Sequence, residues 1–188
     1  MLFQNITKDI IRTLPYLPFS LMAGFFAALC FFLAGIFRKR KFAVSRLITL
    51  FLFFSYLMFI LSVTLLDRKS GSDSRGVSWS VFGTWFYGTK SKGYVIENLM
   101  LFVPYGILGY FLTPLKRARY VVLTAAVLSA VIECMQFVFH SGYAELSDVL
   151  MNTAGAALGA LAAAAVYAAW KRGRHGWESG RSKSEGKE

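Results

Sequence analysis

The sequence predicts an all-α polytopic membrane protein with about five transmembrane helices. Its 188 residues are 56% hydrophobic and 16% charged, and they include 18 Phe, which sets the chain apart from ordinary soluble domains. Five apolar runs follow one another along the chain, and each approaches the roughly 20 residues needed to cross the hydrocarbon of a bilayer. Composition and run length therefore agree on a small integral membrane protein.

The net charge of +11 would suggest a nucleic-acid partner if the chain were soluble. Here, however, Lys and Arg gather in blocks at the ends of apolar runs, which is how the cytoplasmic loops of membrane proteins are marked. We therefore expect no nucleic-acid partner and assign the basic blocks to membrane topology.

Residues 1–66 form a predicted N-terminal two-helix part. The first span, Phe19–Phe37, follows prolines that suit the first turn of a helix, and it ends at the basic block 38–41. The second span, Leu47–Leu66, is rich in Phe and Leu. Its hydroxyl side chains can bond to the preceding turn of backbone, so they need no functional explanation. They are Ser55, Ser62 and Thr64.

Residues 67–93 change in composition to Ser, Gly, Asp and Lys, interleaved with aromatic residues. We predict an extracytoplasmic loop whose aromatic side chains lie at the level of the lipid headgroups. These side chains are Trp79, Phe82, Trp85, Phe86 and Tyr87.

A three-helix core is predicted for 94–170. Its spans are Tyr94–Leu112, Tyr120–His140 and Asp148–Trp170, and a tight turn joins the last two. The tail that follows, 171–188, is basic and poor in apolar residues. We expect this tail to be disordered, because it lacks the apolar side chains that would stabilise a fold.

Polar side chains interrupt the apolar spans of this core. Glu133 and Gln136 are three residues apart, so they share one helical face. Asp148 and Asn152 are four residues apart and share a face of the next helix, while Asn98 opens the first span of the core. These side chains fall at similar depths, and we expect the helices to face one another there.

Glu133 and Asp148 are the candidates for chemistry. A carboxylate within a bilayer is costly, and the spans contain no Lys or Arg to pair with it. Each acid must therefore meet water, a proton, a ligand or neutral donors. We interpret the two acids as a possible acid/base pair or polar site, with Glu145 in the turn above them. The competing interpretation is that these polar groups only fasten helices together by hydrogen bonds.

Four further positions are interpreted as structural. Pro104 removes a helix hydrogen bond, and Gly106 follows it within the same span. Gly155 and Gly159 are four residues apart in an Ala-rich run, which is typical of a close-packing helix face.

We expect no cofactor and no metal ion. The His and Cys residues do not have metal-ligand spacing, and the chain has no phosphate-binding Gly loop and no nucleophile elbow.

Three segments of the core resemble the VanZ-like family of small bacterial membrane proteins. They are ENLMLFVPYG (Glu97–Gly106), VIECMQ (Val131–Gln136) and ELSDVLMNTAGAALG (Glu145–Gly159), in the order and spacing of the family. Our candidate ligand-binding residues, Asn98, Gln136, Glu145 and Asn152, lie within these segments. The positions that match are Asn98, Pro104, Glu133, Gln136, Asp148, Asn152, Gly155 and Gly159.

The resemblance implies an association with low-level resistance to teicoplanin-type glycopeptides, without implying a reaction. The chain departs from the family pattern near the turn: Glu145 stands where the family has Asp, and the Arg that usually precedes it is replaced by Ser141, Gly142 and Tyr143. The charge state of the three acids therefore does not follow from the family pattern.

Two classes of function fit these residues. One is a membrane protein at the outer leaflet that binds an envelope lipid or lipid-linked precursor, or alters how it is presented. The other is an intramembrane enzyme, a hydrolase or transferase, that uses Glu133 or Asp148 as a general acid or base. A small-molecule transporter is a weaker alternative, because five spans show no obvious inverted repeat.

The basic residues predict the orientation of the chain. Two of the loops together with the tail hold 14 Lys and Arg, whereas the other connections and the N-terminal segment hold 7. By the positive-inside rule the N-terminus lies outside and the C-terminus in the cytoplasm. A reporter fused after Trp170 should read cytoplasmic, and a single cysteine in place of Ser72 should react with a membrane-impermeant reagent from outside. Labelling of Ser72→Cys from the cytoplasmic side alone would reverse the assignment.

Overall fold

The structure is a computed structural model. It describes residues 7–8, 11–39, 43–66, 77–78, 89–113, 117–139 and 144–185, with side chains described at all of these except 89–92 and 175–185. The aromatic side chains expected at headgroup level lie outside the described residues.

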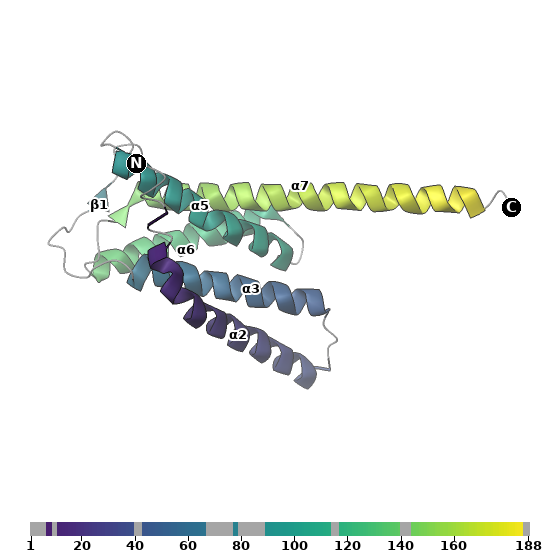
Figure 1. Cartoon of the computed structure of the whole chain (residues 1–188), viewed down its shortest axis with the longest axis horizontal. Helices are drawn as coiled ribbons and strands as arrows, with labels where there is room; N and C mark the ends of the chain where they lie inside the picture. Colours follow the sequence, from purple (N-terminus) through teal and green to yellow (C-terminus); the bar gives the residue numbers. More distant parts are fainter. Residues whose placement is uncertain are drawn as a thin grey trace.

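Five helices of the described chain are long and apolar enough to cross a membrane, which confirms the predicted fold class. These spans are Ile11–Phe37, Val44–Leu66, Gly93–Leu112, Ala118–Val138 and Leu146–Arg174. The elements of Figure 1 are η1 (Leu14–Tyr16), α2 (Leu17–Phe37), α3 (Val44–Leu61), η2 (Ser62–Leu66), β1 (Val77–Ser78), α5 (Thr89–Leu112), α6 (Ala118–Val138), β2 (Ala144–Glu145) and α7 (Leu146–Glu185).

Local sequence explains how the first hairpin begins and ends. A proline lies in the first turn of η1 and another in the first turn of α2, where the missing N–H costs nothing. Lys39, just after α2, has a φ of 50°, a left-handed conformation that ends the helix. Ala43 is extended, and α3 starts at the next residue. The two helices therefore run antiparallel and pack against each other (Figure 1).

The most extensive helix contact joins α5 and α7, which run in the same direction. Glycines make this contact possible. A Cβ added to Gly155 would overlap the carbonyl oxygen of Leu99, and one added to Gly159 would overlap that of Val103. In a bilayer, where water does not drive helices together, such backbone approach supplies the packing energy.

Gly106 makes the reciprocal contact from α5. A Cβ there would overlap the carbonyl oxygen of Ala156, so small residues meet on both helices. Pro104 lies inside α5 as well, and its ring nitrogen cannot donate a helix hydrogen bond. In the preceding turn the Leu101 carbonyl accepts the Tyr56 hydroxyl of α3 at 2.7 Å. A neighbouring helix thus supplies a donor beside the interruption.

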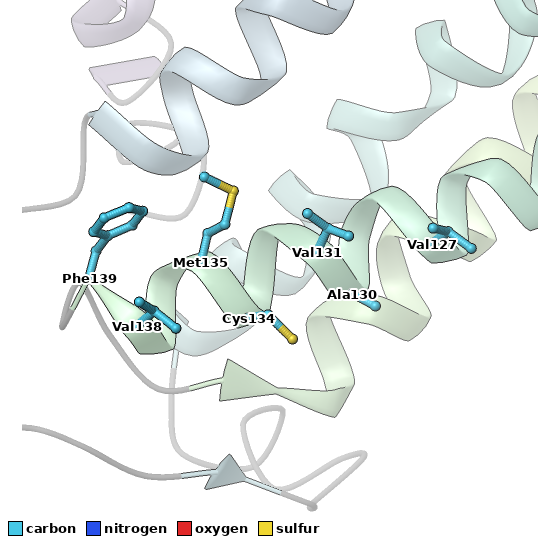
Figure 2. Close-up of a pocket in the computed structure, with 7 residues that line it drawn as sticks. All are labelled: Val127, Ala130, Val131, Cys134, Met135, Val138 and Phe139. Carbon is cyan, nitrogen blue, oxygen red and sulfur yellow. The ribbon is translucent and has the colours of Figure 1, made fainter.

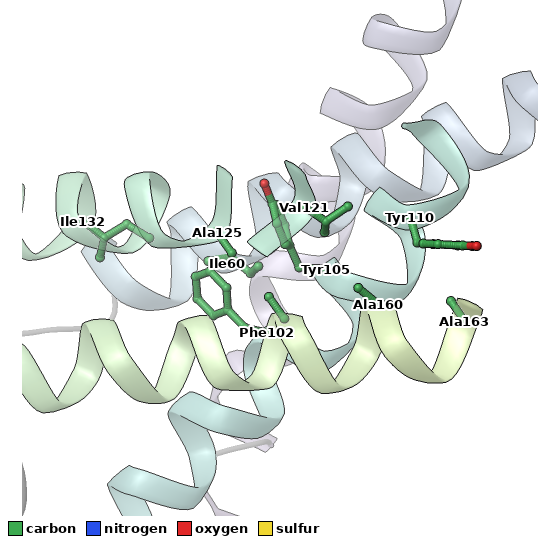
Figure 3. Packing of buried hydrophobic residues seen from close by; sticks show 10 residues of the cluster. Ile60, Phe102, Tyr105, Tyr110, Val121, Ala125, Ile132, Ala160 and Ala163 are labelled. Carbon is green, nitrogen blue, oxygen red and sulfur yellow. The ribbon is translucent and has the colours of Figure 1, made fainter. Parts of the chain in front are cut away.

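The apolar core lies where α3, α5, α6 and α7 meet (Figure 3). Phe102 of α5, Ile60 of α3 and Ile132 of α6 are its largest fully buried apolar side chains. Ala156 and Ala160 of α7 are also fully buried, which allows the bulky side chains of the other helices to lie against it. Most other large apolar side chains are exposed, as expected for surfaces that face lipid.

Two expectations from the sequence need correction. The helix α7 continues to Glu185, so 171–185 are helical where we expected a disordered tail. Extending an existing helix adds one hydrogen bond per residue, whereas starting one is costly, so the Ala-rich span carries the helix onward. The helix α5 begins at Thr89, inside the segment predicted as a loop.

A short parallel strand pair also lies outside the prediction. Val77 pairs with Ala144 and Ser78 pairs with Glu145. This pairing fastens part of the long connection between η2 and α5 to the residues just before α7. The segment 141–147, predicted as a tight turn, thus contributes β2 and the first residues of α7.

Replacing Gly155 by Leu should lower the yield of folded protein and its thermal midpoint in detergent. The larger side chain has to displace the α5 backbone, and overpacking of this kind costs about 1–3 kcal/mol or more. The control is Ala162→Leu, which places the same side chain at an exposed position of α7. Equal stability of the two variants would show that Gly155 does not pack against α5.

Candidate functional site

The alternating direction of the helices brings four helix ends to one side of the bundle. There η2 and α6 end while α5 and α7 begin (Figure 1). We call this side the polar end and the opposite side, where α2 and α5 end and α3 and α6 begin, the basic end. Most of the polar residues identified from the sequence lie toward the polar end.

Glu133 of α6 is held by the start of α7. Its side chain is 5% exposed, and its Oε2 accepts the backbone N–H of Glu145 at 3.0 Å. Glu145 immediately precedes α7, where backbone N–H groups have no helical partners. A carboxylate is a strong acceptor for such a donor. The bond therefore satisfies a buried acid and fixes the N-terminus of α7 against α6.

Two more acids surround this contact. The carboxylate of Glu145 accepts the Ser147 hydroxyl at 3.1 Å, and Ser147 is buried. Asp148 lies in the first turn of α7 and is 8% exposed. The N-terminal end of a helix favours negative charge, so the position suits a carboxylate. Glu133, Glu145 and Asp148 are thus gathered around one helix start.

Asn152 and Ser129 form a buried hydrogen bond below the acids. The Asn152 Nδ2 donates to the Ser129 hydroxyl at 2.8 Å, and both residues are buried. Ser129 precedes Glu133 by one helical turn on α6, so the α6 side of the site continues deeper into the bundle. Sequence reasoning missed Ser129, although its spacing of four residues from Glu133 was a usable signal.

Gln136 reaches a third helix. Its Nε2 donates to the backbone carbonyl of Thr64 at 2.9 Å, and Gln136 is 1% exposed. Thr64 lies in the π-helical segment η2, whose altered bonding pattern frees a carbonyl, and such segments occur often at functional sites. The Thr64 hydroxyl bonds to Ile60 of its own helix. Sequence reasoning weighed only the Thr64 hydroxyl, whereas the backbone carbonyl makes the contact.

Asn98 is not joined to this group by a hydrogen bond between described residues. It is half-buried in α5, one residue before Leu99, which contacts Gly155. The contact between α5 and α7 therefore places Asn98 toward the polar end. Its role in ligand binding stays a prediction.

Three buried polar atoms near these contacts have no hydrogen-bond partner among the described residues. They are Gln136 Oε1, Asn152 Oδ1 and Ser62 Oγ. Both amides use an N–H group on the protein and leave the oxygen, an acceptor, unused. The site can therefore accept further hydrogen bonds from donors such as hydroxyl groups, ammonium groups or water. Within the described part of the chain, no three His, Cys, Asp or Glu side chains are arranged to hold a metal ion.

An apolar groove runs along the outer face of α6, at the same depth in the bundle as the polar site around Glu133 (Figure 2). It is shallow, with a volume of about 460 Å³. The residues that line it are Val127, Ala130, Val131, Cys134, Met135, Val138 and Phe139. Cys134 directly follows Glu133, so the apolar groove and the polar site lie on different faces of the same two turns.

Comparison with known proteins gives one family. A family model described as VanZ/LLP1 matches residues 53–167, which includes the second half of α3 and all of α5 and α6. The match begins within the second span, before the region in which the sequence resemblance was noted. Comparisons with curated proteins and with solved structures gave no match.

The contact between Asn152 and Ser129 can be tested by a double-mutant cycle. Ser129→Ala and Asn152→Ala should each destabilise the protein, and the double variant should lose less than the two together. The expected coupling is about 0.6 kcal/mol and at most about 1.7 kcal/mol, as for other interhelical hydrogen bonds in membranes. Thermal unfolding in detergent provides the measurement. The control cycle pairs Ser129→Ala with Thr153→Val, because the Thr153 hydroxyl bonds to its own helix; equal coupling in both cycles would contradict the contact.

Proposed function

Because the chain belongs to the VanZ/LLP1 family, we propose that it is a cell-envelope membrane protein that binds a lipid or a lipid-linked envelope precursor at the outer leaflet. Binding changes how that molecule is presented at the membrane surface. The protein is thereby associated with glycopeptide resistance of the teicoplanin type, as the family resemblance suggests.

The distribution of basic residues supports the outward placement of the polar end. Most Lys and Arg lie in connections at the basic end and in the C-terminal part of α7, from Lys171 onward. By the positive-inside rule these parts lie in the cytoplasm, so the polar end faces the outer leaflet.

The observation that carries the proposal is the group of acids beside unused acceptors. Glu133 and Asp148 lie near the same helix start, and the oxygens of Gln136 and Asn152 remain available for donors. Hydroxyl-rich or amine-bearing headgroups supply such donors. The apolar groove on α6 lies at the same depth and suits a hydrocarbon chain. A molecule that combines these two parts is an amphiphile.

The second candidate is an intramembrane hydrolase or transferase acting on a lipid or lipid-linked precursor. It is favoured by the acids that flank the buried Ser147: the Glu145 carboxylate accepts its hydroxyl, and Asp148 is its neighbour in the chain. A carboxylate that accepts a hydroxyl proton has the arrangement of a general base. A transporter is the weakest candidate.

Glu133→Gln and Asp148→Asn test whether the acids act beyond holding the helices together. Each amide keeps the shape and an acceptor oxygen but removes the charge, so folding should change little. We expect glycopeptide resistance to fall by about tenfold in at least one variant, first of all Glu133→Gln. The reason is that a hydrogen bond from the bound molecule to a charged carboxylate contributes about 1.5–3 kcal/mol to binding. The measurement is susceptibility of cells at matched protein level.

Thr153→Val is the matched control, because it removes a hydroxyl on α7 that bonds within its own helix. Lipid analysis of the same cells separates the two candidates. A lipid species that disappears together with resistance identifies an enzyme, whereas an unchanged lipid profile with lost resistance identifies binding. Wild-type resistance in both amide variants would contradict a functional role for the acids.

A further inference from the structure

A crevice at the basic end lies between α3, α5 and α6. Its volume is about 650 Å³, within the range of small-molecule sites. We call it the basic-end crevice. It is lined by Phe53, Leu57, Tyr105, Gly109, Leu112, Thr113, Tyr120, Val121, Thr124 and Leu128.

The polar atoms that line the basic-end crevice already have partners. Tyr105 donates to the Thr124 hydroxyl at 3.1 Å, and that hydroxyl donates to the Val121 carbonyl at 2.9 Å. The Thr113 hydroxyl donates to the Gly109 carbonyl at 2.8 Å. These hydroxyl groups are satisfied within the protein and need no polar ligand. The surface that the crevice offers to a bound molecule is therefore mainly hydrocarbon.

Gly109 lines the crevice and lets α5 lie close to α6. A Cβ at this position would lie 2.9 Å from Val121 Cγ1 and 3.6 Å from the ring of Phe53. A side chain here would press on Val121 of α6 and narrow the crevice from the α5 side.

The depth of the basic-end crevice matches one leaflet. Tyr105 of α5 and Thr113, the residue just after α5, are eight residues apart, which is roughly 12 Å along a helix. Half of the hydrocarbon thickness of a bilayer is about 15 Å. The crevice therefore starts at the basic end and stops near the middle of the membrane, as one acyl chain of a single leaflet does.

Cationic side chains stand at its mouth. Arg119 donates to the Tyr120 hydroxyl at 3.3 Å, and its guanidinium lies 5.0 Å from the centre of that ring. Tyr120 lines the crevice, so Arg119 is held beside its entrance. Arg117, exposed, lies just before α6. A guanidinium recognises phosphate by charge and by its fork of donors.

We propose that the basic-end crevice binds one acyl chain of an anionic phospholipid, with the lipid phosphate at Arg119. The lipid comes from the leaflet at the basic end, opposite the one in which the proposed function places the polar site. The apolar walls accept any acyl chain, and the arginines select the negative headgroup. The site is independent of the acids at the polar end.

The test uses the full-length protein in nanodiscs that contain phosphatidylglycerol or phosphatidylcholine with a nitroxide on the acyl chain. Electron paramagnetic resonance measures the motionally restricted fraction of each lipid. Wild-type protein should restrict phosphatidylglycerol more than phosphatidylcholine. Arg119→Gln should lower this preference by about fivefold, the factor expected for one basic residue at a membrane surface. Arg174→Gln is the control, because Arg174 lies over Trp170 at the same 5.0 Å but on α7.

A second variant tests the acyl-chain part. Leu128→Trp fills the inner end of the crevice and should lower the restricted fraction of both lipids, whereas Leu123→Trp, on the exposed face of α6, should leave it unchanged. Thermal midpoints establish that the variants fold, and Gly109→Ala replaces Leu128→Trp if the latter does not. Equal restriction of the two lipids by wild-type protein would overturn the proposal. So would a folded crevice-filling variant that keeps the full restricted component.

Discussion

The hydrogen bond between Glu133 and the backbone N–H of Glu145 is the contact on which the polar end depends. Both groups are costly to bury alone: a carboxylate in a span needs donors, and the first N–H groups of a helix need acceptors. Their meeting at 3.0 Å satisfies both needs and sets where α7 begins relative to α6. The remaining contacts of the site follow from that position. Asn152 then faces Ser129, and the strand pair holds the residues just before α7.

The glycine contacts between α5 and α7 provide the rigid frame for this arrangement. Gly155 and Gly159 lie against backbone carbonyls of α5, so a shift of α7 along its axis would force backbone atoms together. The polar contacts are each modest in a membrane, about 0.6 kcal/mol on average. The packing of α5 against α7 sets the geometry of these polar contacts, and the contacts in turn make the helix arrangement specific. A site built on two closely packed helices and braced by a third can hold carboxylates in fixed positions.

Hydropathy and spacing were sufficient to predict the five spans and the shared faces of α6 and α7. The reason is physical: a span needs about 20 apolar residues, and a polar side chain within one must face protein. The Gln136 contact could not be predicted, because its partner is the Thr64 carbonyl, which depends on a π-helical segment and carries no side-chain signal. The strand pair of Val77 and Ser78 also depends on backbone alone. The continuation of α7 past Trp170 reflects helix cooperativity, which composition underestimates.

Amide hydrogen exchange at Glu145 measures the central contact most directly. In ¹⁵N-labelled protein in detergent, we expect a protected Glu145 amide in wild type and in Glu133→Gln, which keeps an acceptor oxygen. In Glu133→Ala the same amide should lose protection while amides of the α5 and α7 interface keep theirs. A Glu145 amide that exchanges as fast in wild type as in Glu133→Ala would show that Glu133 does not hold the start of α7.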